Sequence, residues 1–223
     1  MKATLTILLT ACLLDAGCAG EKAIRPVTPQ EISLQQEVFS ELNRLRRNPR
    51  GYIPVLEKHK QGFSGNRKYI SEHVALLTQE GIKPVEEAIE FLKKAPAVPA
   101  LKLSDGMSKA ARDHVLDLGP GGKIGHFGTD GSSPGERLSR YGKPVGWVAE
   151  NIGFGDAGGR NMVTLLLVDD GVPDRGHRKK MLSGQYTQVG VACGPHKVYR
   201  HMCVIDFAEN FEEKVVTSLD TEP

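Results

Sequence analysis

The chain has 223 residues, of which 39% are hydrophobic and 25% are charged, an ordinary globular composition that predicts one domain with room for an insertion. The formal net charge of +2 excludes the strong basic field by which nucleic-acid-binding domains attract phosphate. A chain of this length can bury a core without relying on a scaffold of disulfides.

Residues 1–20, "MKATLTILLTACLLDAGCAG", have the pattern of a secretory signal peptide. One lysine precedes an apolar run from Ala3 to Leu14, and small residues follow it. The run is too short to span a bilayer. The alternative to a signal peptide is a helix buried in the core. We expect an exported protein, secreted or extracytoplasmic, whose mature chain has no transmembrane span.

Cys18 is a candidate for lipidation. The sequence "DAGC" at 15–18 is similar to the lipobox of bacterial lipoproteins, although Asp15 stands where that motif has leucine. The chain is therefore either anchored by lipid to a bacterial envelope or simply cleaved nearby. The several acyl chains of a bacterial lipoprotein would anchor it firmly.

Residues 21–30 are expected to form a tether, and residues 31–100 an N-terminal helix, a helical insertion and a connector. The helix should end near Asn48, where "NPRG" follows. Its apolar residues recur at helical spacing, at Leu34, Val38, Leu42 and Leu45.

The insertion is expected over residues 52–94, with a second helix at 85–94 and a stiff connector at 95–100. Between Arg44 and Lys68 the chain carries eight Lys or Arg and one acid, Glu57. Such a stretch could meet an anionic lipid or polymer, or it could be a solvated face.

Residues 101–214 are expected to form the main domain, followed by a tail at 215–223. Ser104 or Asp105 can cap a helix, and "NMVTLLLVDDG" at 161–171 predicts another. Helices come first, strands late and helices between them. This order predicts an α+β fold with a mostly antiparallel sheet.

Two late segments alternate in the period of a strand and predict a hairpin. If Cys193 faces Cys203, the same register also aligns two apolar pairs, namely Val191 with Ile205 and Val189 with Phe207. In an oxidising compartment we expect a cross-strand disulfide between Cys193 and Cys203. The alternative is two small buried residues.

Four residues stand next to glycine or other small residues, where functional groups tend to be displayed. They are His126, Glu136, Glu150 and His177. Two imidazoles can hold a divalent ion such as zinc, and two carboxylates could complete or orient the site. A zinc-bound water beside a glutamate could also hydrolyse a substrate. The local spacing contains no H-E-x-x-H or C-x-x-C signature.

Glycines 153, 155 and 158 match the spacing of a dinucleotide-binding loop, but Asp156 among them would repel phosphate. We expect these glycines to form a tight loop under a cleft, with Glu150 as the functional residue. Trp147 could line a lipid groove or fill the core near Glu150, and we expect the core. The remaining histidines with no partner in sequence are expected to be exposed: His59, His73, His196 and His201.

Four motifs in order resemble the CAP superfamily of cysteine-rich secretory, antigen 5 and pathogenesis-related proteins, also called SCP-domain proteins. They are "GHFGTDGSSPGERL", "AENIGFG", "GHRKKML" and "YTQVGVACG…CVIDFA". The likeness runs from about Leu101 to Phe211, and "NRLRRNP" is similar to the family's opening helix. The chain looks most like the shorter bacterial-type branch.

The resemblance implies a three-layer α-β-α sandwich with an open cleft. By motif, the cleft would hold His126, Glu136, Glu150 and His177, of which the histidines would bind a divalent cation, often zinc. Some members bind sterols or other lipids. This chain departs from the pattern in its long insertion at 52–94 and in the lack of tryptophan in the helix before His177.

Three functions follow as hypotheses. The first is an exported, non-enzymatic binding module with a metal-capable cleft and a lipid, sterol-like or envelope-polymer ligand. The second is a metal-dependent hydrolase, a protease or esterase, with Glu150 as general base and Glu136 orienting the ligand. The third treats the four residues as hydrogen-bonded packing that supports an interaction surface.

Overall fold

The computed structural model describes residues 25–155 and 158–214. The predicted signal peptide with Cys18, Asp156 in the glycine-rich stretch, and the tail at 215–223 lie outside these residues. Within them, no helix combines the length and the apolar character that crossing a membrane requires.

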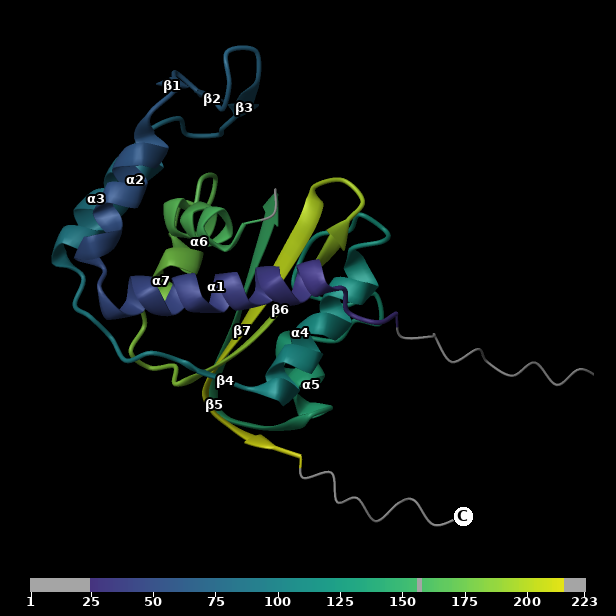
Figure 1. Ribbon diagram of the computed structural model, residues 1–223. Helices are drawn as coiled ribbons and strands as arrows, with labels where there is room; N and C mark the ends of the chain where they lie inside the picture. Colours follow the sequence, from purple (N-terminus) through teal and green to yellow (C-terminus); the bar gives the residue numbers. More distant parts are fainter. Residues whose placement is uncertain (1–24, 156–157, 215–223) are drawn as a thin grey trace, which may run out of the picture.

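A sheet of four strands forms the middle layer, in the order β4-β6-β7-β5. β7 pairs antiparallel with both β5 and β6, while β4 runs parallel to β6. The long strand β5 is therefore an edge of the sheet (Figure 1). The strands are β4 (Lys102–Leu103), β5 (Gly142–Gly155), β6 (Gln188–His196) and β7 (Arg200–Glu213).

Helices cover both faces of this sheet. Side chains of β6 and β7 alternate between the faces, so that Val191 and Ile205 join the core under α1 and α6, whereas Ala192 and Val204 pack against α4. The predicted α+β fold, an α-β-α sandwich with a mostly antiparallel sheet, is confirmed. The helices of the two outer layers are α1 (Pro29–Arg47), α4 (Asp105–Leu118), α5 (Pro134–Ser139), α6 (Gly159–Val168) and α7 (Gly176–Met181).

The first helix is confirmed and begins at Pro29, inside the stretch expected to be a tether. Thr28 accepts a hydrogen bond from the Glu31 amide, and the Glu31 carboxylate accepts one from the Thr28 amide. This capping box satisfies two amides that the first turn leaves unpaired. The helix ends at Arg47, with Asn48 as its C-cap.

The late hairpin has the predicted register. Cys193 lies opposite Cys203, Val191 opposite Ile205 and Val189 opposite Phe207. The predicted disulfide joins the two cysteines, whose Cα atoms are 4.1 Å apart. One register thus brings all three pairs together.

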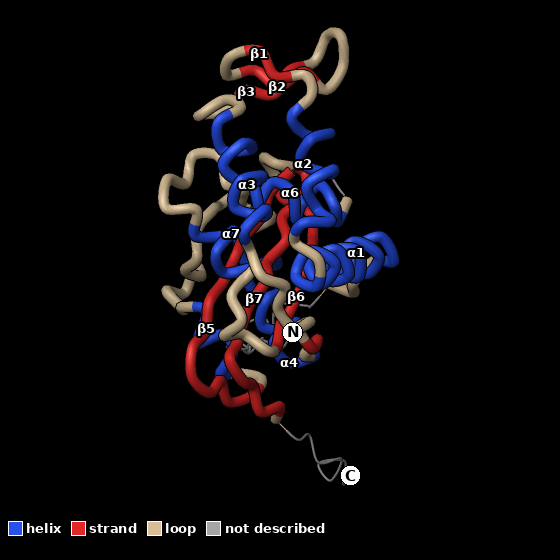
Figure 2. The backbone as a smooth tube through the Cα atoms, turned by 90° about the vertical axis from the view of Figure 1, so that its left-hand side faces the viewer, coloured by secondary structure: helices blue, strands red, loops and turns tan. Residues whose placement is uncertain are grey.

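The insertion is not wholly helical, because its middle forms a three-stranded antiparallel sheet. Gly65, between β1 and β2, has a positive φ of 55° and so permits the tight turn between these short strands, and Gly62, with φ 83°, lies in the turn from α2 into β1. Figures 1 and 2 show this small sheet beyond the outer ends of the insertion's helices. The elements are a short 3₁₀ turn (Arg50–Tyr52), α2 (Ile53–Lys60), β1 (Phe63–Ser64), β2 (Arg67–Tyr69), β3 (Ala75–Leu77) and α3 (Lys83–Lys94).

The helices of the insertion belong to the main core. Leu56 of α2 and Leu92 of α3 are fully buried in the cluster that also contains Leu42 of α1 and Val163 of α6. The insertion therefore extends the layer of α1 and α6, and only its small sheet stands outside that layer.

Candidate functional site

His126 and Glu150 form a hydrogen-bonded couple at the edge strand. The His126 Nδ1 atom lies 2.7 Å from Glu150 Oε1. The glutamate side chain is 1% exposed and the histidine side chain 45% exposed. Because a carboxylate only accepts hydrogen bonds, His126 donates through Nδ1, and this bond does not engage Nε2.

Arg137, which sequence reasoning missed, bonds to both members of this couple. Its buried guanidinium donates to Glu150 Oε2 at 2.5 Å, to the carbonyl of His126 at 3.0 Å and to that of Ser132 at 2.9 Å. The charge of Glu150 is thereby paired inside the protein, as a buried carboxylate requires. The same side chain fixes the loop that carries His126.

A second carboxyl group lies behind Glu150. Asp206 of β7 is directly opposite it in the sheet register and is fully buried. No hydrogen-bond donor among the described residues faces either of its oxygens. Burial raises the pKa of Asp206 well above its ordinary value, and the negative charge of Glu150 raises it further. Burial and the neighbouring carboxylate thus both favour the neutral form of Asp206.

His177 has a carboxylate partner of its own, Asp169, which sequence reasoning also missed. Asp169 Oδ1 lies 2.6 Å from His177 Nδ1, and Oδ2 accepts the His177 amide at 2.9 Å. Asp169 sits in the left-handed region with φ 63° at the end of α6. This conformation turns the chain from α6 toward α7, whose first turn carries His177.

The two couples are attached to adjacent positions of β5. His126 bonds the side chain of Glu150, while the carbonyl of His177 accepts from Asn151 Nδ2 at 3.1 Å. Lys180 of α7 also donates to the Glu150 carbonyl, at 3.0 Å. The carboxylates fix both rings through Nδ1, the arrangement that orients a histidine to use Nε2 on a ligand or cation.

Glu136 makes its contacts elsewhere. It is exposed, and its carboxylate accepts from the Ser133 amide and hydroxyl, both at 2.7 Å, as the N3 residue of the α5 capping box. Its assignment to the site stays a prediction. Among the described residues, no group of three or more His, Cys, Asp or Glu is placed to hold a metal ion.

Several expectations about other residues were wrong, among them the exposure of His59 and His201, which are both half-buried. Trp147 is 66% exposed, whereas His196 is buried and bonds the Lys123 carbonyl. Gly153 lies within β5 and not in a loop. A Cβ atom there would come within 2.3 Å of Met162 Sδ, so this glycine lets α6 pack closely on the strand.

Comparison with known proteins identifies the fold family. One similar solved structure is an extracellular SCP-domain protein of Bacillus anthracis str. Ames, with 18% sequence identity and a TM-score of 0.49; the match covers 83% of this chain and 45% of that one. Another is an outer surface protein of Borrelia burgdorferi, with 19% identity and a TM-score of 0.43; this match covers 58% of this chain and 89% of that one. This chain thus spans less than half of the Bacillus protein. No curated protein matches it. The model of the cysteine-rich secretory protein family, CAP, matches residues 39–207, a range that includes His126, Glu150 and His177. Because this match covers most of the chain, the chain belongs to the CAP family.

Proposed function

We propose that this protein is an extracytoplasmic, non-enzymatic binding module whose recognition site is formed by the His126–Glu150 and His177–Asp169 couples along β5. The observation that carries the proposal is the pair of imidazoles, each held at Nδ1 by a buried carboxylate. Such rings are pre-oriented to bind through Nε2, so that little side-chain freedom is lost on binding.

A divalent cation such as zinc would be held by His126 and His177. The donor type suits zinc, but two histidines fall short of the three protein ligands usual at a catalytic zinc. The bound ion would attract an anionic or oxygen-donor group of the ligand. The site therefore favours ligand capture, and a lipid or envelope polymer is the ligand class we propose.

The hydrolase alternative is less well supported by the contacts of Glu150. Its Oε1 atom bonds His126 and its Oε2 atom bonds Arg137. A general base must reach the proton that it abstracts, and both oxygens of this buried carboxylate already accept hydrogen bonds from the protein. We therefore assign Glu150 a positioning role toward His126.

Calorimetric zinc titration of residues 21–223 tests the proposal. The wild type should show saturable one-site binding that the double variant His126→Ala/His177→Ala loses. His73→Ala, which removes an exposed histidine of the insertion, should bind like the wild type. Circular dichroism verifies folding of each protein. Equal zinc binding by the wild type and the double variant would refute the metal-capable cleft.

An activity assay separates the two functions. A library of peptides and esters should not be turned over by the zinc-loaded protein. Turnover that is lost both on chelation and in Glu150→Gln would establish the hydrolase instead.

A further inference from the structure

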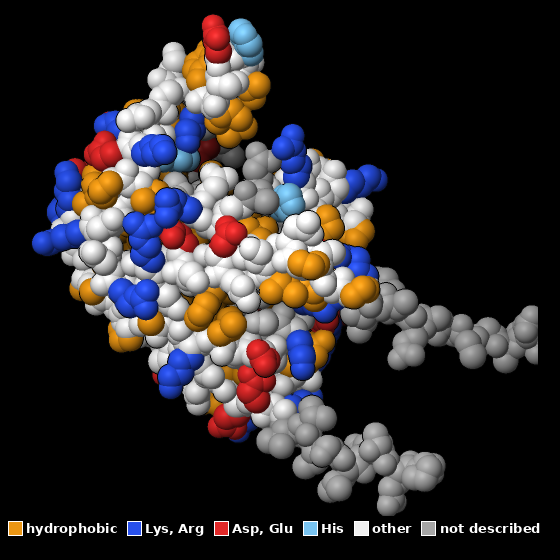
Figure 3. All heavy atoms as spheres, in the orientation of Figure 1, with side chains coloured by type: hydrophobic (Ala, Val, Ile, Leu, Met, Phe, Trp, Pro, Cys, Tyr) orange, Lys and Arg blue, Asp and Glu red, His pale blue; other side chains and the backbone are white. Residues whose placement is uncertain are grey.

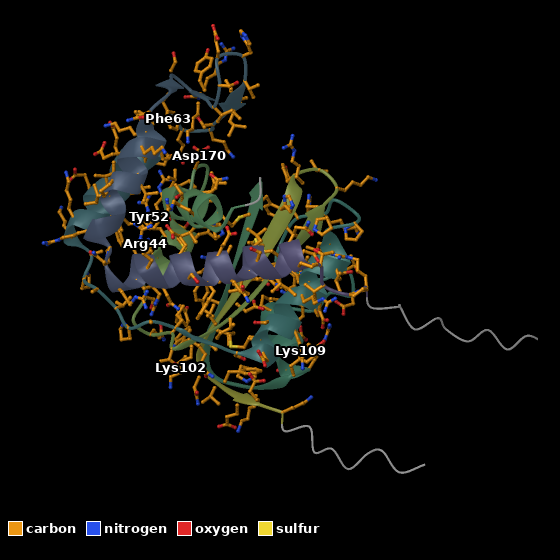
Figure 4. The ribbon with its side chains drawn as sticks, viewed as in Figure 1. Arg44, Tyr52, Phe63, Lys102, Lys109 and Asp170 are labelled. Carbon is orange, nitrogen blue, oxygen red and sulfur yellow. A yellow bond between two sulfur atoms is a disulfide. The ribbon has the colours of Figure 1, made fainter. Side chains whose placement is uncertain are left out.

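A large apolar groove lies between the small sheet of the insertion and the main domain. Its volume is about 710 Å³, within the range of roughly 300–1,000 Å³ typical of small-molecule sites. Phe63 and Asp170 mark its two sides (Figure 4). Figure 3 shows the surface hollowed beneath the lobe that the insertion forms. Apolar side chains from both sides line it, among them Ile70, Val74, Leu76, Phe154, Val198 and Tyr199.

The apolar wall contributed by the insertion is unusually exposed. Leu76 is 50% and Leu77 83% exposed, and Ile70 and Val74 are close to half exposed. Isolated exposed apolar residues are common, but a contiguous set lining one concave surface marks a binding site. The small sheet therefore presents its apolar side chains to the groove instead of burying them in a core.

One end of the groove is basic. A second hollow of about 570 Å³ adjoins the first and shares His59, Lys68 and Asn161 with it. Lys58, Lys68 and Arg160 line this end, and none of its lining residues is Asp or Glu. Arg160 is paired with Glu41 of α1 at 3.0 Å.

Lys68 is the residue best placed to recognise an anion. Its Nζ atom lies 2.7 Å from His59 Nδ1 and 5.8 Å from the centre of the Phe63 ring. Within the described part of the chain, no carboxylate pairs with it. Burial lowers the pKa of Lys68 to about 8 and that of His59 to about 4. A partly desolvated ammonium beside a neutral imidazole gains from an incoming negative charge.

We propose that this groove binds an amphiphile with one long apolar chain and an anionic headgroup. The apolar chain lies between the small sheet and the β6–β7 turn, and the headgroup meets Lys68 and Lys58. A free fatty acid and a single-chain phospholipid share this chemistry. The groove contains neither His126 nor His177, so the inference stands or falls independently of the proposed metal-capable cleft.

Binding of defined probes to residues 21–223, below their critical micelle concentrations, tests the inference. Hexadecanoate and hexadecyl phosphate should each displace a fluorescent fatty acid saturably, with one site per chain. Uncharged hexadecanol should bind about tenfold more weakly or worse, since it lacks the charge-assisted bond to lysine. A comparison of hexadecanoate with a single-chain phosphatidylglycerol then distinguishes the two sources of the headgroup.

Two substitutions address the two parts of the site. Leu76→Asp places a carboxylate in the apolar wall, opposite Lys68 in the β2–β3 register, and so acts against both the apolar chain and the headgroup, whereas Lys68→Gln removes the headgroup cation alone. Each should weaken hexadecanoate binding about tenfold or more. Leu103→Asp, at a leucine of matching 49% exposure on β4, and Lys109→Gln on α4 (Figure 4) should leave the affinity unchanged.

The outcomes separate this inference from the proposed function. His126→Ala/His177→Ala should bind hexadecanoate like the wild type, whatever its zinc affinity. The inference is overturned if no probe binds saturably, if hexadecanol binds as tightly as hexadecanoate, or if Lys68→Gln, on β2 of the small sheet, folds like the wild type and retains full affinity.

Discussion

Arg137 connects the buried carboxylate of Glu150 to the loop that carries His126, through bonds to both residues. Arg137→Ala would leave Glu150 without its buried cation. Removing one partner of a buried ion pair costs about 3–5 kcal/mol, so the free energy of unfolding should fall by this amount in urea denaturation. His126 should also lose its fixed orientation, and zinc affinity should fall with it.

Arg140 provides the matched control for Arg137. It lies three residues further along the chain and pairs with Asp113 and Asp130, but its side chain is 41% exposed. Exposed pairs contribute about 0–1 kcal/mol, so Arg140→Ala should leave stability nearly unchanged. Equal losses in the two variants would contradict the assignment of Arg137 as the buried counterion.

Asp206→Asn should stabilise the protein at neutral pH. Because the folded-state pKa of Asp206 is raised, its contribution to stability is full below the unfolded pKa and is lost as the pH rises toward the folded value. Asparagine has nearly the same shape as the neutral acid but cannot ionise in the unfolded chain. At a pH above both values, each unit by which folding raises the pKa of Asp206 lowers the free energy of unfolding of the wild type by about 1.4 kcal/mol.

Urea denaturation of the wild type and Asp206→Asn at pH 4 and pH 7 checks this expectation. The free energy of unfolding of the variant should exceed that of the wild type at pH 7, and the difference should be small at pH 4. A variant less stable than the wild type at both values would show that Asp206 is ionised and paired in the folded protein.

Three residues of the candidate site were predicted from the sequence because they sit in local motifs. His126, Glu150 and His177 each stand beside glycine or another small residue, and the structure attaches all three to the same stretch of β5. Asp169 and Asp206 were not foreseen, because their roles depend on nonlocal geometry. Asp169 becomes a partner through a left-handed turn, and Asp206 through the register of β7 against β5.

At the scale of the elements, α4 packs on β6 through a glycine. A Cβ atom on Gly190 would lie 2.2 Å from the backbone carbonyl carbon of Met107 and 2.5 Å from its oxygen. Backbone atoms cannot move aside without shifting the helix, so Gly190→Ala should destabilise the protein by about 1–3 kcal/mol or more. Thermal and urea unfolding would measure the loss.

Gly121→Ala is the matched control for Gly190→Ala. A Cβ atom at Gly121 meets nothing closer than 3.6 Å, and no positive φ restricts it. This substitution should change stability by about 0.5 kcal/mol or less. A Gly190→Ala protein as stable as Gly121→Ala would mean that α4 is not seated closely on the sheet.

Long periodic elements could be predicted, and short ones could not. The apolar spacing of α1 and the paired alternation of β6 and β7 each extend over many residues and involve one consistent face. Strands β1, β2 and β3 have two or three residues each, which is too few for a period to be read. The charged residues around them therefore suggested a helical insertion with a solvated face.

At the scale of the whole molecule, one clamp joins the insertion to the turn between α6 and α7. Glu80 accepts two hydrogen bonds from the Arg175 guanidinium, at 2.7 and 2.8 Å, and one from the Gly171 amide. Asp170 in turn accepts the amides of Gln79 and Glu80. The turn beside Asp169 thus holds the small sheet over the groove while it also orients His177.

Glu80→Ala should release the small sheet without unfolding the core. Loss of the charge-assisted bonds should speed amide hydrogen exchange in residues 62–81 about tenfold or more at pH 7 and weaken hexadecanoate binding. The pKa of Glu80 is lowered to about 2 by Arg175 and Gly171. The contribution of Glu80 to holding the small sheet is therefore present above the ordinary pKa of 4.5 and is lost as the pH falls toward 2. The difference in exchange rate between Glu80→Ala and the wild type should thus be smaller at pH 3.

Glu90→Ala, which breaks only the exposed pair with Lys93, should exchange like the wild type. Unchanged exchange in Glu80→Ala would show that the core contacts of α2 and α3 alone position the insertion.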